Sequence, residues 1–132
     1  MRYMLIPDSF KGSMDAQTIC EVMSHAILAV DKSAVIDRIP VADGGEGTVD
    51  AFLAAMGGER VRAQVRGPFG ETVQADYARL SEHTAVVEMA AAAGLPLAAG
   101  RLDPLLASTY GVGELMRDAL QRGARTLLLG LG

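Results

Sequence analysis

The order of its predicted strands and helices constrains the fold of this chain more than any other feature. Residues 2–6 and 34–39 are short apolar runs typical of buried strands, and each precedes a segment whose apolar residues recur with helical spacing. Ser13 is the expected N-cap of the first helix, and Gly57 and Gly58 are expected to end the second. A strand–helix–strand–helix order favours a parallel sheet with helices on its faces. The predicted fold class is therefore α/β, beginning with a Rossmann-like parallel sheet.

The sheet is expected to change its character after Gly58. Residues 61–65 and 73–77 each alternate apolar and polar side chains, with GPFG near the turn between them. This pattern predicts a β-hairpin exposed on one face, unlike the continuously apolar strands before it. We therefore predict a Rossmann-like N-terminal segment over residues 1–58 and the start of a second α/β domain over residues 59–132.

Charge and apolar runs exclude several classes of protein. The net charge is -4 with no basic run, so nucleic acid is not an expected partner. The Ala-rich stretch that begins at Met89 is broken by Gly94 and Pro96, so it is no membrane span. The N-terminus lacks a signal peptide's apolar run, and the single Cys20 suits a reducing compartment. A soluble cytoplasmic protein is the expectation.

Polar clusters follow three of the predicted strands. PDSFKGS (7–13) follows the first strand, PVADGGEGT (40–48) follows the second, and EMA (88–90) follows the strand at 84–88. Because the carboxyl ends of parallel strands lie along one edge of a sheet, these clusters are expected to converge on one crevice. A fourth cluster, STYGVGE (108–114), precedes a helix.

The first cluster has the chemistry of a phosphate site. Lys11 offers a compact positive charge, and the backbone amides near Gly12 and Ser13 open a helix. The alternative is purely structural, with Asp8 and Ser9 in a turn, Ser13 as a cap and Lys11 in solvent.

The second cluster combines glycines with carboxylates. Residues 44–47 could let backbone amides approach a ligand closely, or supply positive φ in a tight turn. Asp43 could bind Mg²⁺, accept a hydroxyl proton or cap the helix, and Glu46 could act likewise or favour the helix start. The cluster is not a Walker A loop, because the chain contains no Gly-Lys pair.

Other chemical signals are weaker. Glu88 ends an apolar strand, where it needs a partner such as Lys or a metal unless it reaches water. Residues 111–116 begin like a dinucleotide fingerprint, but Met116 replaces the third glycine and no strand directly precedes them, so they also fit a plain helix start. Neither His25 nor His83 has partners at ligand spacing, which argues against a zinc site.

Taken together, six blocks resemble the N-terminal part of the type I glycerate kinases. The resemblance covers essentially the whole chain, in order, and its blocks are PDSFKGS, PVADGGEGT, VRGPFGE, AVVEMAAAAGL, DPLLASTYGVGEL and GARTLLLGLG. It implies phosphorylation of D-glycerate with ATP and Mg²⁺, typically to 2-phosphoglycerate, in organic-acid catabolism. It also implies two α/β domains with the active site in the cleft between them.

Members of this family are much longer, so the resemblance implies that the chain is an N-terminal fragment. We expect the isolated fragment to be inactive and to self-associate through exposed sheet edges. The alternative functions are a non-catalytic α/β module that binds a nucleotide or a small acid, and a fragment that needs a partner segment.

The site hypothesis follows from side-chain chemistry and position within these blocks. Lys11 is assigned to phosphate or the glycerate carboxylate, and Asp43 to general base or Mg²⁺ ligand, with Glu46 as a second metal candidate. The predicted substrate-binding residues are Asp8, Ser9, Gly44, Gly45, Glu46, Gly47, Thr48 and Glu88. The predicted nucleotide-binding residues are Tyr110, Gly111 and Gly113.

Overall fold

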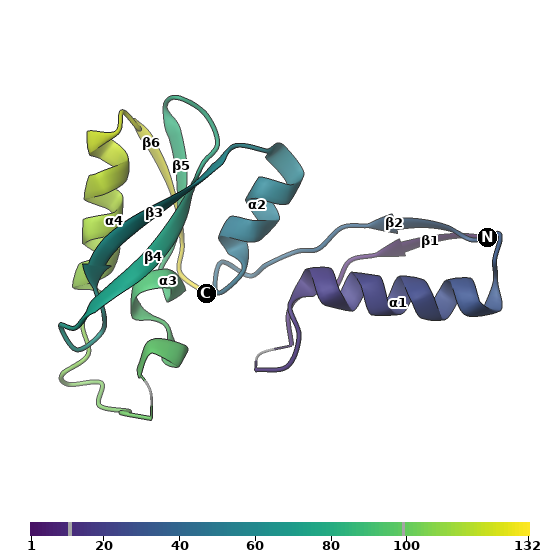
Figure 1. Cartoon of the computed structure of the whole chain (residues 1–132), viewed down its shortest axis with the longest axis horizontal. Coiled ribbons are helices and arrows are strands. Elements are labelled where there is room, and N and C mark those ends of the chain that lie inside the picture. Colours follow the sequence, from purple (N-terminus) through teal and green to yellow (C-terminus); the bar gives the residue numbers. More distant parts are fainter. Residues whose placement is uncertain (11, 99) are drawn as a thin grey trace. The chain divides into compact units, whose positions relative to one another are not determined.

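The computed structural model describes residues 1–10, 12–98 and 100–132, which form two compact units (Figure 1). The first unit comprises Met1–Asp43 and the second comprises Gly44–Gly132. Both contain strands and helices, which confirms the predicted α/β class.

In the first unit, β1 (Arg2–Leu5) pairs in parallel with β2 (Val35–Arg38), and α1 (Ala16–Val30) connects them. A parallel pair requires such a crossover, because a tight turn can join only antiparallel strands. Ile19 and Cys20 of α1 are buried, as is Leu5 of β1. The predicted parallel strand–helix–strand arrangement is therefore confirmed for this part of the chain.

The N-cap prediction for α1 was wrong by two residues. Asp15 is the N-cap, and its carboxylate accepts hydrogen bonds from the Thr18 amide at 2.7 Å and the Thr18 hydroxyl at 3.0 Å. These bonds lower the pKa of Asp15. Ser13 instead lies in a preceding turn, where its amide donates to the Phe10 carbonyl. A charged acceptor that reaches both groups of Thr18 defines the helix start.

The second unit is built on a four-stranded sheet in the order β3-β4-β5-β6. Its strands are β3 (Glu59–Arg66), β4 (Thr72–Arg79), β5 (Thr84–Glu88) and β6 (Thr126–Gly130). β3 and β4 form the predicted antiparallel hairpin, with the register Val61↔Tyr77, Ala63↔Ala75 and Val65↔Val73. β4 and β5 are also antiparallel, whereas β5 and β6 are parallel.

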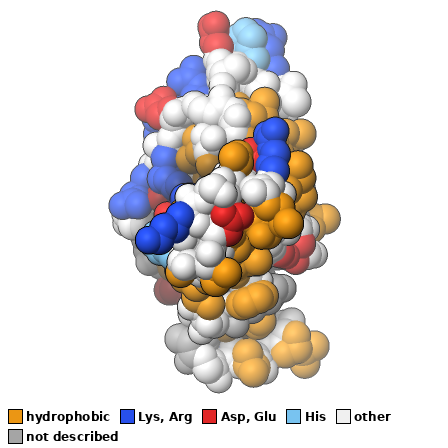
Figure 2. Space-filling model, turned by 90° about the vertical axis from the view of Figure 1, so that its right-hand side faces the viewer, with side chains coloured by type: hydrophobic (Ala, Val, Ile, Leu, Met, Phe, Trp, Pro, Cys, Tyr) orange, Lys and Arg blue, Asp and Glu red, His pale blue; other side chains and the backbone are white. Residues whose placement is uncertain are grey.

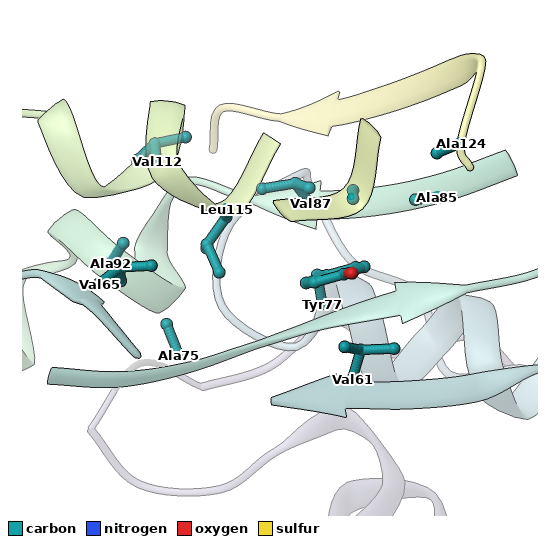
Figure 3. Packing of buried hydrophobic residues seen from close by; sticks show 11 residues of the cluster. Val61, Val65, Ala75, Tyr77, Ala85, Val87, Ala92, Val112, Leu115 and Ala124 are labelled. Atoms are coloured by element: carbon teal, nitrogen blue, oxygen red, sulfur yellow. The ribbon is translucent and has the colours of Figure 1, made fainter. Parts of the chain in front are cut away.

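Helices cover both faces of this sheet. Figure 1 shows α4 (Tyr110–Gln121) on one face and α2 (Thr48–Met56) on the other, while α3 (Ala90–Ala93) and a short 3-10 turn (Leu95–Ala98) follow β5. Beneath α4, Leu115 is fully buried and belongs to the same apolar cluster as the sheet residues Val87 and Tyr77 (Figure 3). The opposite face has a smaller apolar cluster, formed by Val49, Ala78 and Val86.

The start of α4 packs closely on the end of β3. A Cβ on Gly111 would overlap the carbonyl oxygen of Arg66, whereas a Cβ on Gly113 would meet nothing within 4 Å. The Glu114 carboxylate also accepts a hydrogen bond from the Arg66 amide at 2.8 Å, and the Arg66 guanidinium lies 4.4 Å from the Tyr110 ring centroid. Gly111 is thus required for helix–sheet packing.

The compact units divide at Asp43 and Gly44, whereas the sequence places a domain boundary near Gly58. Helix α2 belongs to the second unit by its contacts, because Val49 packs against Ala78 and Val86. The boundary between complete domains stays a prediction.

Apolar side chains remain exposed in both units (Figure 2). In the first unit they include Met4 and Ile6 of the β1 segment, and in the second Leu102 and Leu105 of the loop before α4. None of the helices in the described ranges is long and apolar enough to cross a membrane.

Candidate functional site

The carboxyl ends of β5 and β6 lie beside the start of α2 within the second unit. Glu88 is the register partner of Gly130, and the Met89 amide donates to the Gly130 carbonyl at 2.9 Å. The glycine-rich loop 44–47 leads directly into α2. The structure thus brings residues 44–48 of one predicted polar cluster beside Glu88 of another.

The glycines of this loop serve the chain's own packing. A Cβ on Gly130 would meet the Gly44 carbonyl oxygen, and a Cβ on Gly44 would lie 3.2 Å from the Gly132 amide nitrogen. Gly44 and Gly47 also have φ values of 99° and 92°, which side chains rarely adopt. Both a tight turn and a close approach of two backbone segments therefore need bare backbone here.

Glu88 caps α2 from the neighbouring strand. Its Oε2 accepts a hydrogen bond from the Val49 amide at 2.9 Å, and the Gly47 amide also bonds the carboxylate. Within the described chain, Gly47 at the N-cap provides no side-chain cap of its own. Within the described chain, Glu88 thus has a helix start as its partner, and a Lys or metal partner stays a prediction.

Burial raises the pKa of Glu88. The hydrogen bonds from Val49 and Gly47 offset this effect in part, while the nearby Asp50 and Glu46 carboxylates raise the pKa further. A half-buried carboxylate with a raised pKa at a sheet edge is a feature enriched in functional sites.

Glu88 also lines a polar groove of about 450 Å³ beside α2. Its walls come from α2, β3, β4, β5 and the start of α3. The lining residues are Val49, Asp50, Arg60, Arg62, Gln74, Ala75, Asp76, Glu88 and Ala91. This volume is within the range of small-molecule sites, although the lining is more polar than usual.

Ion pairs connect residues that line the groove. The Arg60 guanidinium binds the Asp50 carboxylate of α2 and lies 3.9 Å from Oδ2 of Asp76. Arg62 binds Asp76 through two hydrogen bonds of 2.7 and 2.9 Å. The Arg62 hydrogen bond lowers the pKa of Asp76, although burial opposes it. The groove is lined by two arginines and three carboxylates, those of Asp50, Asp76 and Glu88. Its net charge is therefore -1 when all five groups are ionised.

Four residues of the groove carry no signal in the sequence that marks a site: Asp50, Arg60, Arg62 and Asp76. The alternating pattern of the hairpin indicates only an exposed polar face. A register for the hairpin would have shown that Arg62 and Asp76 occupy directly opposite positions. The pair between Arg60 and Asp50 could not be predicted from the sequence, because it depends on where α2 packs on the sheet.

Thr48 is the first residue of α2 and is 6% exposed. Its hydroxyl oxygen is buried and has no hydrogen-bond partner among the described residues. A buried unsatisfied hydroxyl is costly, so it calls for an explanation.

The remaining predicted residues are distributed over both units. Asp8 accepts a hydrogen bond from the Ser9 amide at 2.7 Å in the first unit, and Asp43 is the last residue of that unit. Lys11 lies outside the described residues. The convergence of these residues with residues 44–48 stays a prediction.

The predicted nucleotide residues lie in the first turn of α4. Tyr110 is exposed beneath Arg66, and Gly113 is exposed. Gly111 has a sufficient packing explanation in its contact with β3. A nucleotide contact at this helix stays a prediction.

The fold and the site define the class of protein: a mixed α/β chain with a polar groove beside α2 and a glycine-rich loop that leads into this helix. The profile described as Glycerate kinase family matches residues 3–132, so the chain belongs to the glycerate kinase family.

Individual relatives agree with this assignment. The chain is 43% identical over 130 residues to glycerate kinase of Halalkalibacterium halodurans, covering 97% of this chain and 34% of the relative. It is 40% identical over 134 residues to glycerate 2-kinase of Escherichia coli, covering 100% and 35%. A Salmonella typhimurium crystal structure assigned as glycerate kinase 2 shares its fold, with a TM-score of 0.76, 36% identity, and coverage of 100% of this chain and 36% of that one. The chain thus spans about a third of the length of these relatives.

Proposed function

We propose that this chain supplies part of the active site of a kinase that phosphorylates D-glycerate with ATP. The observation that carries the proposal is the family match over residues 3–132, which includes every polar cluster. The product would be phosphoglycerate, typically 2-phosphoglycerate, formed in organic-acid catabolism.

In the proposed reaction, a glycerate hydroxyl oxygen bonds to the γ-phosphorus of ATP as the bond to the β-phosphate oxygen breaks. The Asp43 carboxylate takes the hydroxyl proton or holds Mg²⁺, and Lys11 binds the phosphate or the glycerate carboxylate. Residues 44–48 would orient the substrate, and the start of α4 at Tyr110 would face the nucleotide. Such a reaction depends mainly on positioning and charge stabilisation, which suits these residues.

The donor set fits Mg²⁺ only as part of a nucleotide complex. Among the described residues, no group of three or more His, Cys, Asp or Glu side chains could hold a metal ion. Mg²⁺ usually takes one or two protein carboxylates together with substrate phosphates. The exposed Glu46 carboxylate and Asp43 are the candidates, and the ion would neutralise developing charge on the phosphoryl group.

A chimera tests this proposal. Joining this chain to the C-terminal two-thirds of Escherichia coli glycerate 2-kinase should give an enzyme that releases ADP only when glycerate is present. Lys11→Ala and Asp43→Asn should each abolish turnover, while the control Lys32→Ala should not. A folded chimera without glycerate-dependent turnover would contradict the proposal. The 132-residue chain alone should show no turnover.

Thr48 separates substrate binding from folding. Its hydroxyl has no partner in the described chain, so Thr48→Val should keep or raise stability by about 1 kcal/mol, because an unsatisfied polar group is removed. If the hydroxyl binds glycerate, the same variant of the chimera should have a higher KM for glycerate. An unchanged KM would remove Thr48 from the proposed site.

We also propose that the chain acts in the cytoplasm and self-associates when isolated. The free Cys20 is buried, which suits a reducing compartment. β6 is an edge strand without charged residues, and its Leu128 and Leu129 are each 41% exposed. A single monomer peak in light scattering would contradict self-association.

A further inference from the structure

The start of α2 depends on contacts from outside the helix. The helix has nine residues, and its N-cap, Gly47, provides no side-chain hydrogen bond within the described chain. Short helices are marginal without tertiary contacts. Two strands supply them: Glu88 of β5 accepts from the Val49 amide, and Arg60 of β3 binds Asp50.

Arg60 occupies the position between the carboxylates of the groove. It pairs with Asp50 on α2 and approaches Asp76 on β4 at 3.9 Å. The Glu88 carboxylate is also close enough to raise the pKa of Arg60 by its charge. Arg62, the other arginine of the groove, is bound to Asp76 by two hydrogen bonds.

Without a cation at this position, the repulsion between Glu88 and the carboxylates at the start of α2 would be uncompensated. Asp50 of the first turn and Glu46 before it both disfavour the ionised form of Glu88. Glu88 must nevertheless accept from the Gly47 and Val49 amides to cap the helix. Arg60 counters the repulsion, because its charge acts on Asp50 and Glu88 together.

We propose that Arg60 is a positioning residue that holds the first turn of α2 on the sheet and so fixes the glycine-rich loop 44–47. The loop is continuous with this turn, and Gly44 at its other end packs on Gly130. Only the last step, from a fixed loop to an oriented substrate, rests on the proposed kinase function.

The role of Arg60 is local and distinct from general stability. Its side chain is 43% exposed and that of Asp50 is 66% exposed. Exposed ion pairs add little to the free energy of unfolding, so removal of Arg60 should leave the unfolding midpoint nearly unchanged. Its effect should appear in the helix start and in the titration of Glu88.

Amide-resolved NMR of the 132-residue chain tests the proposal. Arg60→Met should speed hydrogen exchange of the Val49 amide by roughly two- to fivefold, which is what loss of an exposed pair allows. It should also move the Glu88 titration to higher pH. Arg62→Met is the matched control, because Arg62 pairs with Asp76 on the same face without a hydrogen bond to α2. Arg60→Lys should restore part of both effects by keeping the charge.

Equal exchange in Arg60→Met and Arg62→Met, or an unchanged Glu88 titration in Arg60→Met, would overturn the positioning role. The chimera separates this outcome from failure of the kinase proposal. If the wild-type chimera is inactive while the NMR effects hold, the proposed function fails and the positioning of α2 stands. If the chimera is active, Arg60→Met should raise the KM for glycerate more than Arg62→Met does. If KM and kcat were both unchanged in Arg60→Met, the inference that the fixed loop orients the substrate would be overturned.

Discussion

Replacing Gly111 by Ala should destabilise the second unit, although alanine is the better helix former. The added methyl group would overlap the Arg66 carbonyl oxygen, which belongs to the backbone of β3 and cannot rotate away. Helix α4 would have to move outward, and the 2.8 Å hydrogen bond between the Arg66 amide and Glu114 would lengthen. The helix start would thus lose two fixed contacts with the sheet.

The magnitude follows from three opposing terms. Overpacking costs about 1–3 kcal/mol. Weakening a hydrogen bond to a charged group costs about 1–3 kcal/mol more. Replacing glycine by alanine inside a helix returns about 1 kcal/mol. We therefore expect Gly111→Ala to lower the free energy of unfolding by about 1–5 kcal/mol.

Gly113→Ala is the matched control on the same helix. Nothing lies within 4 Å of the added Cβ, and the residue is exposed, so this variant should gain about 0.5–1 kcal/mol. Urea unfolding followed by amide-resolved NMR of the second unit measures both changes. If Gly111→Ala proved as stable as Gly113→Ala, the close packing of α4 on β3 would be refuted.

Three further predictions concern the core and two titrating groups. Leu115 is fully buried, so Leu115→Ala should cost about 2–5 kcal/mol in urea unfolding, whereas Leu120→Ala, at a half-exposed position, should cost far less; similar costs would contradict the core assignment. Burial, together with the hydrogen bond to Asp118, raises the pKa of Tyr77 from 10.0 to about 12. Its contribution to stability is therefore complete below pH 10 and is lost as the pH rises to about 12. Unfolding measured across this range should show that loss in the wild type and not in Tyr77→Phe. The pKa of Glu88 is higher in the folded state than in the unfolded state. Its contribution to the free energy of unfolding is therefore complete below the ordinary carboxyl pKa, and it is lost as the pH rises through the folded-state pKa. The free energy of unfolding of Glu88→Gln should therefore fall less than that of the wild type over this rise, and equal slopes would refute the burial of this charge.

The hairpin could be predicted, although not its strand ends, because its information is local. Alternation of apolar side chains decides which face each residue occupies, and a shift of one residue would expose the whole set. The pattern therefore predicts which side chains share a face, whereas the turn fixes the register that pairs Val61 with Tyr77. The parallel pairing of β1 and β2 was equally accessible, because the apolar helix between them has to cover the sheet.

The groove could not be predicted, because its contacts join segments far apart in the chain. Glu88 accepts a hydrogen bond from the amide of Val49, which lies 39 positions away in the chain. Nothing in the strand pattern identifies that partner. The sequence did show that Glu88 needs compensation, and it offered Lys or a metal. A helix start is an equally good partner for a carboxylate, because its free amides and dipole carry partial positive charge. The packing of α2 on β4 and β5 is what brings this helix start to Glu88, and the sequence pattern does not contain it.

The glycine-rich loop illustrates why composition alone leaves function open. Bare backbone at residues 44–47 could favour a ligand, but Gly44 already needs it to pack against Gly130 and Gly132, and Gly47 needs it to reach positive φ ahead of α2. These needs do not compete with a substrate. A loop held at one end by close backbone packing and at the other by Glu88 has few conformations left to lose on binding, so less binding free energy is spent on ordering it. In the proposed reaction, such preorganisation would help these residues to orient the substrate, because phosphoryl transfer depends mainly on positioning.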